Sequence, residues 1–139
     1  MTRSMFEART LAVSVRRPPE VVYAYAADPR NLPAWSFIES VEPAGDRWLA
    51  RTSAGPVLLR FAAPNTLGVL DHDVELAPGK VLRVPMRVIA NGDGSEVLFT
   101  LFRQPGTSAA AFEQDARTVG EDLAALKAVL ERAAATNVG

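Results

Sequence analysis

The stretch that decides the fold is SAAAFEQDARTVGEDLAALKAVLERAA, which runs from Ser108 to Ala134. It contains no proline, and its apolar residues recur in steps of four and three, which places them on one face of a helix. These residues are Phe112, Ala116, Val119, Leu123, Leu126 and Leu130. A helix of this extent is about 40 Å long, enough to span a compact domain of this chain length. The rest of the chain must therefore supply the surface that covers the apolar stripe.

The middle of the chain is predicted to form short antiparallel strands. Turns rich in proline and glycine separate segments of alternating apolar and polar residues, and a first segment of this kind covers residues 8–16. Two short helices are expected after that first strand, one beginning at Pro18 and one near Arg30, with a break at Asp28-Pro29 between them. The remaining six strands are predicted at 37–42, 46–53, 56–62, 68–76, 80–90 and 95–103. An antiparallel meander has one face to cover, and the long helix is the only element large enough.

Composition limits the classes of function. The chain has 139 residues, for which we expect a single domain over residues 1–139. A net charge of −1 with scattered basic residues argues against nucleic-acid binding. The absence of cysteine excludes disulfides and thiolate sites. No apolar run reaches the length of a membrane span or a signal peptide, so we expect a cytoplasmic protein without stable membrane insertion.

This order of elements, together with the segment PPEVVYAYAADPRNLPAW at 18–35, resembles the SRPBCC superfamily of START-like lipid-transport proteins and polyketide cyclases/dehydrases. The segment 69–103 is similar to a bacterial subgroup of unassigned function. The resemblance implies an α+β helix-grip fold, in which a seven-stranded antiparallel curved sheet is crossed on its concave face by the C-terminal helix. The matching residues are Pro18, Pro19, Glu20, Tyr23, Asp28, Pro29 and Trp35.

Strand alternation predicts which residues face the interior of such a fold. In segment 68–76 acidic residues occupy every second position and must face water, so His72 points inward with Leu70 and Val74. His72 is the only histidine. It is a candidate for ligand contact or for proton transfer, and the alternative is a buried neutral histidine satisfied by its neighbours.

The candidate ligand-binding residues are those predicted to line the space between sheet and helix. Each has an alternative interpretation as ordinary core, and Gly120 has an alternative as a tolerated glycine at the edge of the stripe. The candidates are Trp35, Trp48, Phe61, His72, Met86, Phe99, Phe112, Ala116, Val119 and Gly120.

The acidic pairs are not predicted to be catalytic. Asp71 and Asp73 are expected to face water, and Asp115 and Asp122 lie seven residues apart beside a polar helix face. No metal site is expected, because one inward histidine lacks further ligands, and no cofactor motif is present.

The sequence therefore predicts a binding or carrier protein for a small hydrophobic or amphipathic molecule. One alternative is a polyketide cyclase- or dehydratase-like enzyme in which His72 acts as acid or base, with Thr52 or Tyr25 as the second group. The other alternative is an interaction domain of the chaperone-activator kind with a collapsed cavity. A homodimer is left open.

Overall fold

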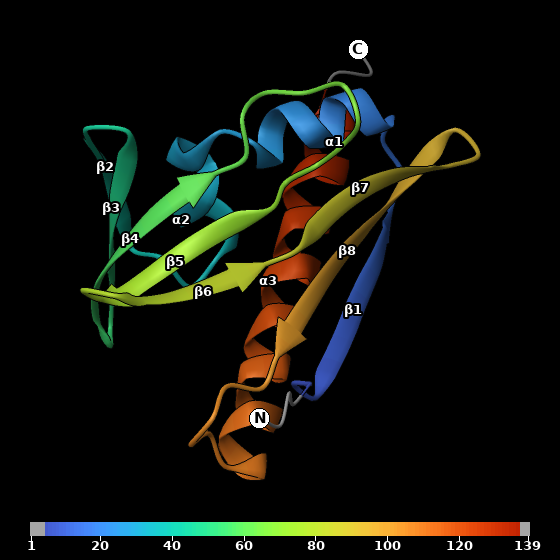
Figure 1. The fold of residues 1–139 in the computed structure, drawn as a ribbon. Coiled ribbons are helices and arrows are strands. Elements are labelled where there is room, and N and C mark those ends of the chain that lie inside the picture. The colour runs from blue at the N-terminus through green and yellow to red at the C-terminus, as the bar shows by residue number, and fades with distance from the viewer. Residues whose placement is uncertain (1–4, 137–139) are drawn as a thin grey trace.

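The computed structural model describes residues 5–136 and has an α+β architecture with a long C-terminal helix (Figure 1). Its strands pair in antiparallel fashion, as predicted. In chain order the elements are β1 (Ala8–Val15), α1 (Pro19–Ala26), a 3-10 turn η1 (Pro29–Asn31), α2 (Leu32–Trp35), β2 (Ser40–Ala44), β3 (Arg47–Thr52), β4 (Gly55–Phe61), β5 (His72–Ala77), β6 (Lys80–Val84), β7 (Met86–Asn91), β8 (Gly94–Phe102) and α3 (Ala109–Thr136).

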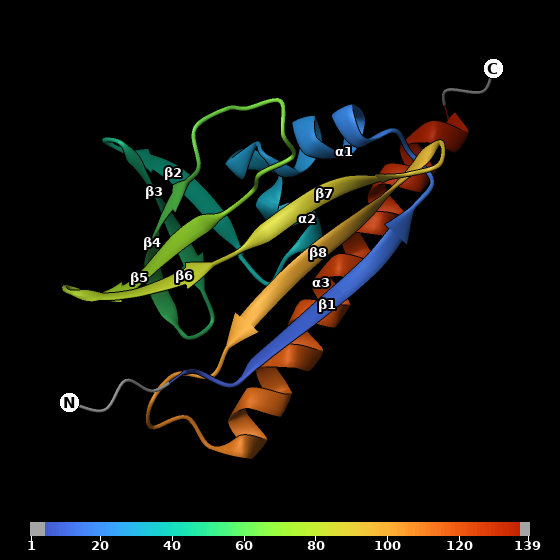
Figure 2. The same ribbon diagram turned by 45° about the vertical axis from the view of Figure 1, so that its right-hand side comes forward.

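The strand count differs from the prediction. The described chain has eight strands in two sheets, ordered β1-β8-β7 and β2-β3-β4-β5-β6, so the prediction of one seven-stranded sheet was wrong (Figure 2). The predicted strand 80–90 divides into β6 and β7 on either side of Pro85. Proline has no backbone N–H to donate to a ladder, so the strand breaks there and its two halves join different sheets.

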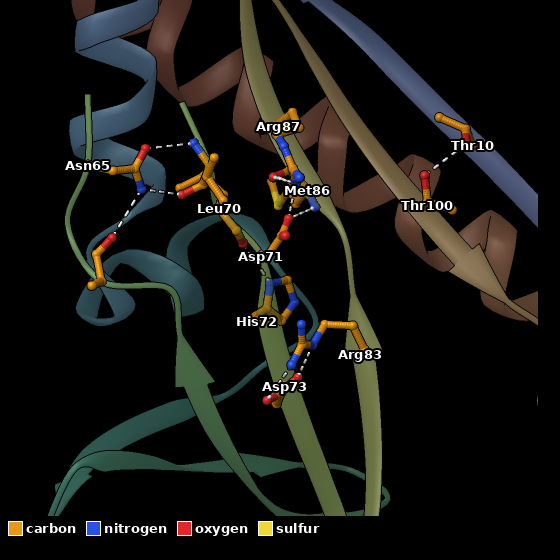
Figure 3. Close-up of polar contacts among 12 residues, drawn as sticks. Thr10, Asn65, Leu70, Asp71, His72, Asp73, Arg83, Met86, Arg87 and Thr100 are labelled. Carbon is orange, nitrogen blue, oxygen red and sulfur yellow. Dashed lines mark hydrogen bonds and ion pairs between the residues drawn. The ribbon is translucent and has the colours of Figure 1, made fainter. Parts of the chain in front are cut away.

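The residues that precede β5 join the two sheets. The Leu70 N–H donates to the Met86 carbonyl at 2.9 Å, and the Val88 N–H donates to the Gly68 carbonyl at 2.9 Å. Asp71 accepts a hydrogen bond from the Met86 N–H at 2.9 Å and pairs with the Arg87 guanidinium (Figure 3). Asp71 thus satisfies the first backbone donor after Pro85, a role that a purely water-facing side chain would not have.

A glycine is required at this joint. Gly68 has φ +73°, and a Cβ built on it would collide with the Val88 carbonyl oxygen. Only glycine adopts this conformation without strain and also lets the two backbones approach so closely. The loop that contains Gly68 is held by Asn65, whose side-chain oxygen accepts from the Leu67 and Val69 N–H groups.

The apolar stripe of α3 is buried as predicted. Ser108 caps the helix, since its hydroxyl accepts from the Ala111 N–H at 3.0 Å. The helix packs mainly against β1 and α2, and in both views it runs alongside β1 and β8 while β2–β6 extend away from it (Figures 1 and 2). The stripe residues at most 5% exposed are Phe112, Ala116, Leu123, Leu126 and Leu130.

Several residues that carry the family resemblance have structural roles. The Tyr23 hydroxyl accepts from the Asn65 N–H at 2.9 Å, which ties α1 to the loop before β5. Asp28 caps η1 by accepting from the Arg30 N–H at 3.0 Å. Trp35 is buried in the main core. These residues therefore fix how α1 and α2 enter and leave the fold.

Candidate functional site

A cluster of half-buried side chains lies on the inward faces of the two sheets. Four of its residues belong to the larger sheet and one, Phe99, belongs to β8 of the smaller sheet. We call it the concave-face cluster, and it consists of Trp48, Phe61, His72, Val74 and Phe99. Strand register brings its members together: Phe61 lies opposite His72, while Trp48 and Val74 both lie opposite Leu59. The inward direction predicted for these strands agrees with full burial of Leu59, Leu70, Val84, Met86, Val88 and Val97 on the same face.

His72 sits at the centre of this cluster. Its ring stacks on Phe61 with centroids 5.2 Å apart and meets Phe99 edge-on at 6.0 Å. Its Nδ1 lies 3.0 Å from the Leu70 carbonyl oxygen (Figure 3). Burial lowers the pKa of His72 below its ordinary value, because the imidazolium loses hydration among apolar neighbours. The neutral imidazole is therefore the form that the fold favours.

The cluster remains partly open although it points toward the interior. All five of its side chains are half-buried, whereas the stripe of α3 is closed against β1 and α2. Leu76, at the irregularity of β5 between Glu75 and Ala77, is 43% exposed. Helix α3 therefore covers the smaller sheet more completely than it covers β2–β6.

The other predicted ligand-binding residues lie outside this cluster. Met86 and Trp35 are buried in the main core, although Met86 is the cross-strand neighbour of Phe99. Phe112 and Ala116 are buried on the inner side of α3 itself, and Val119, on the same helix, is half-buried against the core. Gly120 faces β1, where an added Cβ would meet the Leu11 side chain at 3.7 Å. The structure thus brings together Trp48, Phe61, His72 and Phe99.

Trp35 has an unusual polar atom. Its side chain is 7% exposed, and its Nε1 is the one buried side-chain nitrogen or oxygen in residues 5–136 without a hydrogen-bond partner. Buried donors are normally paired with protein or water.

Asp122 is a titratable group that the sequence prediction missed. Burial raises its pKa to about 6, and its carboxylate accepts a hydrogen bond from the Phe37 N–H at 3.4 Å, next to α2. Burial also raises the pKa of Asp115. The signal was present in the sequence, because Asp115, Val119 and Asp122 repeat the four-three spacing of the apolar stripe. Two helical turns separate the carboxylates by about 10 Å, too far to share a proton.

Two hollows occur on the surface away from the concave-face cluster. One of about 340 Å³ lies where the end of β1 meets the β7–β8 hairpin, and one of about 210 Å³ lies on the outer face of β3–β6. Neither is lined by a predicted ligand-binding residue. Within residues 5–136, no three histidine or acidic side chains are grouped to hold a metal ion.

Comparison with known proteins supports the fold. No protein-family model matches the chain, and no curated protein sequence is similar to it. A START superfamily protein from Mycobacterium smegmatis is similar with a TM-score of 0.73 and 11% identity over 90% of this chain and 97% of that one. This chain has the START-like helix-grip fold.

Two further solved structures are similar to this chain over most of their length. XoxI from Bacillus cereus is similar with a TM-score of 0.74 and 19% identity, over 88% of this chain and 94% of that chain. Aha1 from Colwellia psychrerythraea, solved as a dimer, has a TM-score of 0.73 and 14% identity over 90% of this chain and 96% of that chain. Identities this low establish a shared fold, and the function has to be argued from the site. In residues 5–136 no helix has the length and apolarity needed to cross a bilayer.

Proposed function

We propose that this helix-grip protein binds a small apolar or amphipathic molecule against the concave-face cluster. The observation that carries the proposal is that the rings of Phe61, His72 and Phe99 meet on the inward face, with Trp48 on the same face, and that all four side chains stay partly exposed there. Aromatic side chains left uncovered in a concave surface are typical of ligand sites.

The burial of apolar surface at this cluster can supply enough free energy for weak to moderate ligand affinity. A ligand that removes roughly 200 Å² of apolar surface from water gains about 5 kcal/mol before the cost of association. The gain comes from surface that the fold itself leaves uncovered at Trp48, Phe61 and Phe99. Fully buried residues such as Leu59 have no further surface to contribute.

A binding role fits the polar groups better than catalysis does. His72 has no hydrogen bond or ring contact with Tyr25 or Asp122 in the described part of the chain. Thr52 is occupied, because its hydroxyl donates to the Gly55 carbonyl at 2.7 Å within the β3–β4 turn. A cyclase- or dehydratase-like reaction requires a second group near the substrate, whereas a carrier requires one polar group or none.

The test is a fluorescence titration with N-phenyl-1-naphthylamine, a neutral apolar probe. We expect saturable probe emission, together with quenching of tryptophan emission because Trp48 borders the site. Val74→Asp, on the inward face of β5, should abolish the saturable signal. Val81→Asp is the matched control, because Val81 is 52% exposed on the outer face of the neighbouring strand β6 and should leave binding unchanged.

Two results would overturn the proposal. Absence of saturable binding with the folded wild-type protein would favour the protein-interaction alternative. Equal loss in Val74→Asp and Val81→Asp would show that the probe does not bind at the concave-face cluster.

A further inference from the structure

We propose that this site selects ligands that carry a hydrogen-bond donor, such as a neutral alcohol, phenol or amine, and that His72 Nε2 is the acceptor. The inference rests on the proposed binding function and specifies the chemistry of its ligand. Such a site prefers ligands with a hydroxyl or N–H group over ligands of similar shape that offer only a carbonyl or ether oxygen.

The Leu70 carbonyl determines which ring nitrogen of His72 carries the proton. A carbonyl oxygen can only accept, so the 3.0 Å contact with Nδ1 requires a hydrogen on Nδ1. In a neutral imidazole the other nitrogen, Nε2, then has a lone pair and no hydrogen. His72 therefore presents an acceptor and no donor to whatever lies beyond Nε2.

The orientation of the ring is fixed by its neighbours. Phe61 stacks on one side of the ring at 5.2 Å, and Phe99 meets it edge-on at 6.0 Å. Turning the ring over would exchange Nδ1 with a carbon and would break the hydrogen bond to Leu70. The two aromatic contacts and this hydrogen bond together hold Nε2 in one direction.

Nε2 is available to a ligand. Nε2 makes no hydrogen bond within residues 5–136. It also keeps a small contact with solvent, because Trp35 Nε1 is the only completely buried side-chain nitrogen or oxygen without a partner in that part of the chain. Phe61, Phe99 and Val84 lie next to the His72 ring. A ligand that donates a hydrogen bond to Nε2 and also covers these apolar side chains therefore gains binding free energy from both contacts.

The charges near His72 are already paired. Asp71 is bound to Arg87, and Asp73 is bound to Arg83 (Figure 3). By strand alternation both carboxylates lie on the opposite face of the sheet from His72. Neither carboxylate therefore offers a free charge for a cationic ligand at Nε2, which favours a neutral donor.

The first experiment compares three ligands of one ring system by calorimetry. 2-Naphthol has a donor, 2-methoxynaphthalene has the same oxygen capped by a methyl group, and 2-acetylnaphthalene has an acceptor only. We expect wild-type protein to bind 2-naphthol about tenfold more tightly than the other two. His72→Phe keeps an aromatic ring at this position without Nε2, and it should reduce that ratio to about one.

The second experiment needs no variant. Because His72 is the only histidine, its ring nitrogens give the only histidine signals in a ¹⁵N spectrum. We expect a protonated Nδ1 and an unprotonated Nε2, and addition of 2-naphthol should shift the Nε2 signal. This spectrum keeps the inference falsifiable if His72→Phe does not fold.

The outcomes separate the inference from the proposed function. If no naphthalene binds, the proposed function fails and the inference fails with it. If all three bind equally, or if His72→Phe retains the preference for 2-naphthol, the protein is a binder but the inference is wrong. A protonated Nε2 in the wild-type spectrum also overturns it.

Discussion

The two sheets of this molecule differ in how closely the long helix packs on their inner faces. The smaller sheet, β1-β8-β7, lies along α3, and of its inward residues Val15, Val88 and Val97 are at most 3% exposed while Leu11, Val13 and Phe99 are half-buried. The larger sheet, β2–β6, extends away from the helix and leaves Trp48, Phe61, His72 and Val74 half-buried. The same alternating pattern thus produces a closed half, which packs on the long helix, and an open half, which extends away from it.

Gly68, at the joint between the halves, should be the most sensitive position. Gly68→Ala places a Cβ against the Val88 carbonyl at a positive φ, and we expect a loss of about 4 kcal/mol in the free energy of unfolding. Gly79→Ala is the control, because Gly79 has φ +80° with open space around it and should cost about 1 kcal/mol. Urea denaturation of both variants measures the difference, and equal losses would show that the joint is not tightly packed.

Truncating an apolar side chain to alanine should reduce the free energy of unfolding by different amounts in the two halves. Leu126, which is 0% exposed, belongs to the closed half, and Leu126→Ala should cost about 3 kcal/mol. Phe61→Ala removes a larger side chain, but that side chain is only partly buried, so we expect only about 1–2 kcal/mol. If chemical denaturation shows Phe61→Ala to be the more destabilising of the two, the cluster belongs to the core and the comparison fails.

Asp122 should make stability depend on pH. Its pKa in the folded protein is raised to about 6, so between about pH 4 and pH 6 the folded state binds more protons than the unfolded state. The free energy of unfolding therefore falls as pH rises through this window. Asp122→Asn keeps an acceptor for the Phe37 N–H and removes the charge, so above pH 6 it should be more stable than wild type by about 1–2 kcal/mol.

The control for Asp122 is its exposed neighbour Glu121. Thermal melts at pH 4 and pH 7.5 should show the benefit of Asp122→Asn only at the higher pH, and Glu121→Gln should show a smaller benefit there, because the Glu121 charge contributes less than burial does to the raised pKa of Asp122. A benefit that is equal at both pH values would mean that the carboxylate is not desolvated in the folded state.

The smallest effect is expected where α1 contacts the loop before β5. Tyr23→Phe removes the hydroxyl that accepts from the Asn65 N–H and should cost about 1 kcal/mol. Amide hydrogen exchange should quicken at Asn65 and Val69 and remain unchanged in β1 and β8. Unchanged exchange at Asn65 would show that this hydrogen bond does not hold the loop.

The sequence was most informative where a periodic pattern acts over a long segment. The four-three spacing predicted the buried stripe of α3, and strand alternation predicted the inward direction of Val84, Met86 and Val88 even across Pro85. The division of the sheet was missed, although a proline within a predicted strand is itself a sign of a break.

The composition of the site was harder to predict than the fold. Spacing placed Gly120 on the apolar side of α3, but not whether that side faces β1 or the concave-face cluster. This depends on how α3 crosses the two sheets, a tertiary property that no local pattern records. Asp122 was missed because an acidic residue was taken to face water, and its burial follows from the position of α2 beside the helix.

The central claim is that the open half binds a small apolar molecule on its inward face, and isotope-filtered NMR with bound N-phenyl-1-naphthylamine tests it most directly. The account predicts intermolecular NOEs from the probe rings to the side chains of Phe61, His72 and Val74. NOEs to Leu58 and Val81 on the outer face instead, or none to the inward residues at saturating probe, would contradict it.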